Sequence, residues 1–229
     1  MPDYPYCLLQ VLDIKADNIM FGINDDSVFN DFEEQELKDP CPRKEVDGRT
    51  IYLSRELRMP KKWGAPVLCD FGSAVSGDIE HSEDVQPNIY RAPEVILEAP
   101  WTYNADIWNV GCMIWNIFEN ESLFTGLDSE SGKYRSKSHL AEMIKLLGPP
   151  PPSLLEQGKL SNKFFPDEDG LRLETFPHDR VPLEERETTL EGDDKDIFLR
   201  LIRKMLQWEP SKRSSAKELG DDEWISKNL

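Results

Sequence analysis

Residues 105–118, ADIWNVGCMIWNIF, constrain the fold more than any other segment of the chain. Apolar side chains occur on nearly every side of a helix drawn through them, whereas a surface helix keeps a polar face. Such a helix is stable only when other elements cover it, and a chain of 229 residues is long enough to supply them. The segment therefore predicts a central helix buried inside a helical domain.

Other segments show helical periodicity as well. HLAEMIKLLG at 139–148 is amphipathic and ends at a glycine followed by prolines, which is a strong helix stop. In residues 194–208 the apolar side chains form one helical stripe with a second stripe beside it. The two stripes are Ile197, Leu201 and Met205, and then Phe198, Ile202 and Leu206. A last short helix is predicted within 215–225, and residues 158–193 are rich in loops.

Short strands are predicted in the first third of the chain. IMFGI at 19–23 and APVLCDFGSA at 65–74 contain short apolar runs, and the second run ends abruptly at Asp70. IYLSREL at 51–57 is interpreted as an isolated strand. The charged stretch from residue 24 contains a short helix that prolines at 40 and 42 stop. The expected architecture is a mainly helical body preceded by a few short strands.

The composition limits the class of partner and the compartment. The formal net charge of −17 argues against nucleic acid or an anionic membrane as the main partner and favours basic partners. The four cysteines lack CxxC pairing, so reduced thiols are expected, which suits the cytoplasm or the nucleus. The first ten residues do not form a signal peptide, and no window approaches the roughly 20 apolar residues of a membrane span. We expect a soluble intracellular protein.

One group of polar residues suggests phosphoryl transfer. Asp13, Lys15 and Asn18 form the pattern D-x-K-x-x-N, and Asp70 opens the sequence DFG. Transfer of a γ-phosphoryl group needs a carboxylate beside the acceptor hydroxyl, such as Asp13, and a cation that reaches the γ-phosphate, such as Lys15. Asn18 and Asp70 supply the oxygen ligands that Mg²⁺ prefers between phosphates. Each motif alone is weak, and Asp13 by itself would be interpreted as a turn residue.

The order of the motifs carries a family resemblance. After DFG come RAPE at 91–94, D-x-W-x-x-G at 106–111, and EPSKRSSA at 209–216. In this order the chain from 11 to 229 resembles the C-terminal lobe of a eukaryotic protein kinase. The resemblance implies a protein-kinase-like C-lobe fold, mainly α with a few short β-strands, and the use of ATP and Mg²⁺.

The resemblance also implies roles for individual residues. The four polar residues above take the catalytic and metal-binding roles already described, with Asp13 as the catalytic aspartate. Glu94 is expected to pair with Arg213 and so to hold the activation segment. Asp106 is expected to cap the buried helix and to brace the catalytic loop. The three histidines receive no role.

A finer resemblance concerns the substrate. SHLAEMIKLLGPPP at 138–151 is similar to the region around helix G in the group that contains cyclin-dependent, MAP, dual-specificity and SR-protein kinases. The charged insert at about 24–65 resembles that of fungal relatives of the SR-protein kinases. Those enzymes phosphorylate serines beside arginines, so an Arg/Ser-rich protein is the expected substrate. The insert is most simply a solvated excursion, and the alternative is a docking or regulatory surface.

Several kinase features are absent from the sequence. ATP binds a kinase under a Gly-rich loop and beside a strand lysine, and the 229 residues contain neither motif. Residues 1–10 are interpreted as an atypical N-terminal remnant. Val11 and Leu12 replace the histidine and arginine of the usual catalytic loop. Pro87 stands where a threonine bridges the catalytic aspartate and lysine, and SKSH at 136–139 lacks the acids that grip arginine-rich substrates.

The sequence therefore predicts ATP-dependent phosphorylation of protein Ser or Thr by an incomplete kinase fold. This chain alone is expected to be inactive. The alternative is a non-catalytic, truncated kinase remnant that acts as a protein- or peptide-binding module. No direct contact with nucleic acid or membrane is expected, and neither the oligomeric state nor the physiological substrate follows from the sequence.

Overall fold

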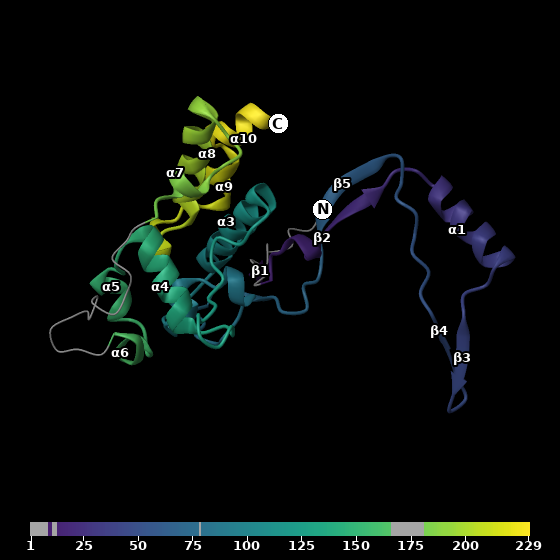
Figure 1. The fold of residues 1–229 in the computed structure, drawn as a ribbon, viewed down its shortest axis with the longest axis horizontal. Helices are drawn as coiled ribbons and strands as arrows, with labels where there is room; N and C mark the ends of the chain where they lie inside the picture. Colours follow the sequence, from purple (N-terminus) through teal and green to yellow (C-terminus); the bar gives the residue numbers. More distant parts are fainter. Residues whose placement is uncertain (1–8, 11–12, 78, 166–180) are drawn as a thin grey trace, which may run out of the picture. The chain divides into compact units, whose positions relative to one another are not determined.

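The structure is a computed structural model that describes residues 9–10, 13–77, 79–165 and 181–229. The backbone divides into two units (Figure 1). The first unit consists of Met1–Asn18 and Asp70–Leu229, and the second consists of Ile19–Cys69. The predicted insert at 24–65 lies inside the second unit, which also includes the strands on either side of it.

The first unit is mainly helical, as predicted. Its elements are β1 (Leu9–Gln10), the 3-10 turn η1 (Ala16–Asn18), β6 (Val75–Ser76), η2 (Asn88–Tyr90), α2 (Pro93–Ile96), α3 (Asn104–Glu119), α4 (Ser136–Leu147), α5 (Pro152–Leu155), α6 (Ser161–Phe164), α7 (Leu183–Arg186), α8 (Gly192–Met205), η4 (Pro210–Lys212), α9 (Ala216–Gly220) and α10 (Glu223–Asn228). β1 and β6 pair antiparallel. Over the described ranges, no helix combines the length and the apolar character that crossing a bilayer requires.

Helix α3 forms the centre of the first unit, which confirms the prediction of a buried helix at 105–118. Trp108, Cys112 and Trp115 are at most 1% exposed. At Gly111 an added Cβ would lie 3.0 Å from the Cβ of Met205, so glycine lets α8 approach closely. These contacts explain why a helix with few polar residues is stable at this position.

Helix α8 packs on α3 through the two predicted apolar stripes. Phe198 stacks on Phe118 with the ring centroids 4.5 Å apart. Each of the six stripe side chains is at most 8% exposed, and such burial contributes about 1.5–3 kcal/mol per large apolar side chain. The stripe therefore anchors the C-terminal helices to the centre of the unit.

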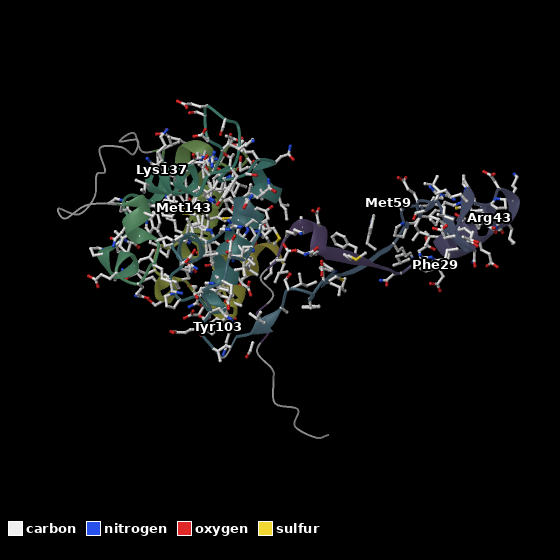
Figure 2. The ribbon with its side chains drawn as sticks, turned by 90° about the horizontal axis from the view of Figure 1, so that it is seen from below. Phe29, Arg43, Met59, Tyr103, Lys137 and Met143 are labelled. Atoms are coloured by element: carbon white, nitrogen blue, oxygen red, sulfur yellow. The ribbon has the colours of Figure 1, made fainter. Side chains whose placement is uncertain are left out.

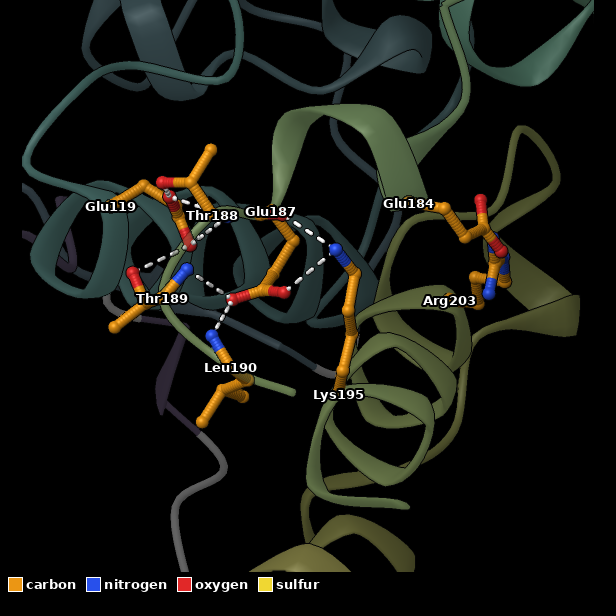
Figure 3. Close-up of polar contacts among 8 residues, drawn as sticks. All are labelled: Glu119, Glu184, Glu187, Thr188, Thr189, Leu190, Lys195 and Arg203. Carbon is orange, nitrogen blue, oxygen red and sulfur yellow. Dashed lines mark hydrogen bonds and ion pairs between the residues drawn. The ribbon is translucent and has the colours of Figure 1, made fainter. Parts of the chain in front are cut away.

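Polar contacts hold the segment that precedes α8 in place (Figure 3). Glu119, at the end of α3, accepts a hydrogen bond from the Thr188 hydroxyl at 2.9 Å. The buried Glu187 carboxylate accepts the amide hydrogen bonds of Thr189 and Leu190 and pairs with Lys195 at 3.2 Å. Burial alone would raise the pKa of Glu187, but the two amides and Lys195 outweigh burial and lower that pKa. Glu187 therefore stays ionised inside the unit.

The C-terminal segment forms two helices, whereas a single short helix was predicted. Ser215 and Glu218 form a capping box at the start of α9. The Asp222 carboxylate then accepts a hydrogen bond from the Trp224 amide at 2.9 Å and caps α10. Two separate caps within eight residues make two helices.

The second unit contains β2 (Ile19–Ile23), α1 (Ser27–Lys38), β3 (Arg43–Val46), β4 (Arg49–Tyr52) and β5 (Trp63–Leu68). β2 pairs antiparallel with β5, so both predicted apolar runs are strands. The prediction of an isolated strand at 51–57 was wrong, because β4 begins earlier and forms a hairpin with β3. Asp47 and Gly48 have positive φ of 50° and 74°, as a tight two-residue hairpin turn requires.

Candidate active site

The D-x-K-x-x-N segment folds into a compact hydrogen-bonded turn in the first unit. Lys15 Nζ donates to Asp13 Oδ2 at 2.8 Å. Asn18 Nδ2 donates to the Asp13 backbone carbonyl at 2.8 Å and to Asp13 Oδ2 at 3.1 Å. The 3-10 turn η1 makes these contacts, because it returns the chain from Lys15 to Asn18 with a backbone hydrogen bond of 2.9 Å. Three of the predicted site residues therefore lie together in one hydrogen-bonded turn.

The surroundings of Lys15 in this turn favour its protonated, positively charged form. The hydrogen bond to Asp13 raises the pKa of Lys15 above its ordinary value, although partial burial opposes the rise. The negative charges of Asp17 and Asp70 raise the same pKa further. The contribution of Asp70 is smaller than that of Asp13.

Asp70 occupies a constrained position in the DFG segment. Its φ of 61° is in the left-handed region that few residues other than glycine adopt. The Gly72 amide donates to its Oδ1 at 3.4 Å. At Gly72 an added Cβ would approach that same oxygen to 3.3 Å, so glycine leaves room for the carboxylate.

The residues present fit a magnesium site. Because Nδ2 of the buried Asn18 is held by Asp13, the amide oxygen Oδ1 points away from that contact and is the atom suited to a metal. Asp70 adds a carboxylate, and oxygen ligands of these two kinds suit Mg²⁺ that also binds phosphate. Over the described residues, no group of three or more His, Cys, Asp or Glu side chains that could hold a metal ion occurs.

Glu94 and Arg213 form a fully buried ion pair. Arg213 donates to both carboxylate oxygens of Glu94 at 2.6 Å, and both side chains are 0% exposed. Further hydrogen bonds from the guanidinium reach the Asn104 carbonyl at 2.8 Å and the Gln207 carbonyl at 3.0 Å. The guanidinium carbon lies 5.2 Å from the Trp108 ring centroid. The pairing implied by the resemblance is present. The guanidinium donates hydrogen bonds to four acceptors, which are the two carboxylate oxygens and the two backbone carbonyls.

The capping role expected of Asp106 is wrong. The N-cap of α3 is Tyr103, and Asp106 lies within the first turn of the helix. Its carboxylate is favourably placed near the positive end of the helix dipole. Asp106 and Ile14 line the same small apolar hollow, so the aspartate does lie beside the catalytic turn. Bracing of that turn therefore stays a prediction.

Two residues that received no role in the sequence analysis organise the segment before RAPE. Arg91 donates to the Val85 carbonyl at 3.1 Å and to the Gln86 carbonyl at 3.2 Å. Gln86 has φ of 71°, and its side chain donates to the Ala105 carbonyl and accepts from the Ala92 amide. Sequence patterns gave no signal for Gln86, because any polar residue fits a loop.

Three further predictions concern Pro87, the pair Val11 and Leu12, and the cysteines. Pro87 precedes η2 with φ of −58° and has no N–H to donate. Val11 and Leu12 lie outside the described residues. Cys41, Cys69 and Cys112 are free thiols, and burial raises the pKa of Cys112, so that thiol stays protonated.

The hydrogen-bonded turn of Asp13, Lys15 and Asn18, with Asp70 in the same unit, fits a site of the phosphoryl-transfer class. Residues 11–225 match the protein kinase domain family, so the chain belongs to the protein kinase family.

Curated relatives agree with this assignment. The chain is 43% identical over 204 residues to a serine/threonine protein kinase of Aspergillus fumigatus, which covers 88% of the chain and 51% of the relative. It is 32% identical over 181 residues to the serine/threonine-protein kinase SKY1 of Saccharomyces cerevisiae, covering 77% of the chain and 24% of the relative. It is 30% identical over 215 residues to the human dual specificity protein kinase CLK1, covering 90% of the chain and 38% of the relative. The chain thus spans about half or less of the length of these relatives.

Proposed function

We propose that the chain forms the catalytic and metal-binding part of an SR-protein-kinase-like serine/threonine kinase that works in the cytoplasm or nucleus. The parent protein transfers the γ-phosphoryl group of ATP to serine or threonine in basic, Arg/Ser-rich proteins. The hydrogen-bonded turn of Asp13, Lys15 and Asn18, with the charge of Asp70 acting on it, carries this proposal. The net charge of −17 supports a basic substrate.

Each residue of the turn has a definite chemical task. Over the described residues, the hydrogen bonds to the Asp13 carboxylate fall on Oδ2, so Oδ1 accepts the proton of the substrate hydroxyl. Lys15 supplies positive charge where the transferred phosphoryl group gathers negative charge. Asn18 and Asp70 hold Mg²⁺, which when bound neutralises phosphate charge.

The adenine-binding elements are proposed to come from a part of the parent protein outside these 229 residues. The sequence has no Gly-rich loop and no strand lysine of the kinase type, and the Aspergillus relative is about twice as long as the region it shares with this chain. The chain alone is therefore proposed to be inactive, because no described element clamps the α- and β-phosphates. The 1–10 remnant and the kinase domain at 11–229 keep their predicted boundaries in this proposal.

Transfer of labelled phosphate to an Arg-Ser peptide tests the proposal. The parent protein should phosphorylate the peptide, Asp13→Asn should abolish transfer, and residues 1–229 alone should show none. Transfer that survives Asp13→Asn would refute the catalytic assignment. If the parent protein binds the peptide but transfers nothing even with Mg-ATP, the non-catalytic binding module is the correct function.

A further inference from the structure

The second unit has an apolar surface that its own residues leave uncovered. Within Ile19–Cys69, every residue of which is described, Val28 is the one large apolar side chain that is buried. Those between 40% and 78% exposed are Met20, Phe21, Phe29, Leu37, Val46, Ile51, Tyr52, Leu53, Leu57, Met59, Trp63 and Val67. A two-stranded hairpin in water is marginally stable, and exposed apolar patches mark interaction sites.

One side of the β3–β4 hairpin combines cations with aliphatic side chains. Lys44 is paired with Ile51, and Val46 with Arg49, so these four side chains project from the same side of the hairpin. All four are exposed. We call them the hairpin face. A basic and aliphatic surface on a chain of charge −17 favours a partner surface that is acidic and apolar.

Two acidic residues of helix α1 bind the segment that follows the β3–β4 hairpin. Arg55 Nε donates to Glu36 at 3.1 Å, and the Cys41 thiol donates to the same carboxylate at 2.8 Å. Arg58 pairs with Asp31, five residues before Glu36 in the helix. These contacts hold α1 against the following segment, while Phe29, Glu33, Glu34 and Leu37 remain exposed.

Four exposed residues of α1 have the chemistry that complements the hairpin face. Phe29, Glu33 and Leu37 are spaced at i, i+4 and i+8, and Glu34 lies beside them. Phe29 is 50% and Leu37 is 77% exposed, and both glutamates are exposed. We call these four residues the α1 face. Figure 2 labels Phe29 and Arg43, which mark α1 and the start of the hairpin.

We propose that a second copy of this chain covers both surfaces. The hairpin face of each copy packs on the α1 face of its partner, so the two contacts are related by a two-fold axis. In each contact Lys44 and Arg49 lie against Glu33 and Glu34 of the other chain, with the aliphatic and aromatic side chains between them. The same copy does not supply this cover, because Ile51 remains 49% exposed within the unit.

Charge reversal tests the dimer on the full chain. The hairpin variant carries Lys44→Glu and Arg49→Glu, and the α1 variant carries Glu33→Lys and Glu34→Lys. Analytical ultracentrifugation should show a wild-type dimer and, for each variant alone, dimerisation weaker by about tenfold or more. Mixing the two variants should restore dimers, because both contacts of the mixed pair then join opposite charges.

Matched controls distinguish loss of the proposed dimer contact from a general effect of net charge. Lys133→Glu with Lys137→Glu, and Glu121→Lys with Glu130→Lys, change the net charge by the same amounts at exposed positions of the first unit. These controls should dimerise like the wild type, and circular dichroism should show that every variant is folded. A monomeric wild type, a dimer unaffected by the hairpin or α1 reversals, or a mixture that stays monomeric would each overturn the proposal.

Discussion

Replacement of Glu94 by glutamine should destabilise the first unit severely. The glutamate carries half of a fully buried ion pair, so Glu94→Gln leaves the Arg213 guanidinium in the interior without a counter-charge. The two backbone carbonyls that also bind Arg213 keep their hydrogen bonds, which limits the loss. Breaking one side of such a pair costs about 3–5 kcal/mol, against a total stability of about 5–15 kcal/mol for a typical domain.

Urea unfolding measured by tryptophan fluorescence tests this prediction, because Trp108 lies beside the guanidinium. The midpoint should fall while the dependence of stability on urea stays constant. The double variant Glu94→Leu/Arg213→Met should lose less than the single variant, because it leaves no charge unpaired. A single variant that loses under about 1 kcal/mol, as an exposed pair would, refutes the reasoning.

The remaining predictions concern acid stability, packing and metal binding. Burial lowers the pKa of His139 to about 3, whereas the unfolded side chain titrates near 6.5. The unfolded state therefore binds the extra proton below pH 6.5, and stability should fall by about 1.4 kcal/mol per pH unit from pH 6.5 towards 3. If the urea midpoints of the wild type and of His139→Gln change equally with pH, this prediction is contradicted. Gly111→Ala should cost about 1–3 kcal/mol in a thermal melt, because the new Cβ meets Met205 at 3.0 Å; an unchanged melting temperature would oppose it. Asn18→Leu should weaken Mn²⁺-induced broadening of the Asp70 NMR signals, and broadening equal to wild type would argue against Asn18 as a ligand.

The period of apolar residues predicted the long helices of the first unit, but not its four-residue helices α2, α5, α6 and α7 and not the hairpin of the second unit. Residues 105–118 and the α8 stripes were predictable because burial selects apolar side chains at helical spacing. The strands β3 and β4 are exposed on both sides, so no alternation of apolar and polar residues marks them. The Asp47–Gly48 pair was the available signal, since that dipeptide favours a tight hairpin turn.

The sequence predicted the contacts of some residues of the candidate site better than those of others. The contacts among Asp13, Lys15 and Asn18 follow from their short spacing, because one turn of chain brings them together. The pair of Glu94 with Arg213 spans 119 positions, and only the family resemblance suggested it. The cap assigned to Asp106 failed because the N-cap lies three residues earlier, at Tyr103, and the exact ends of helices are weakly encoded.

The distribution of charge separates substrate capture from self-association. Within Ile19–Cys69 acidic and basic residues nearly balance, so almost all of the excess negative charge lies in the unit that contains Asp13. Long-range attraction of the proposed Arg-rich substrate to that unit would be screened by salt, since the Debye length is about 10 Å at 0.1 M and about 3 Å at 1 M. The proposed dimer contact instead combines close charge pairs with apolar burial, and apolar burial persists in salt. Added salt should therefore weaken peptide capture by the parent protein more steeply than it weakens dimerisation of the chain.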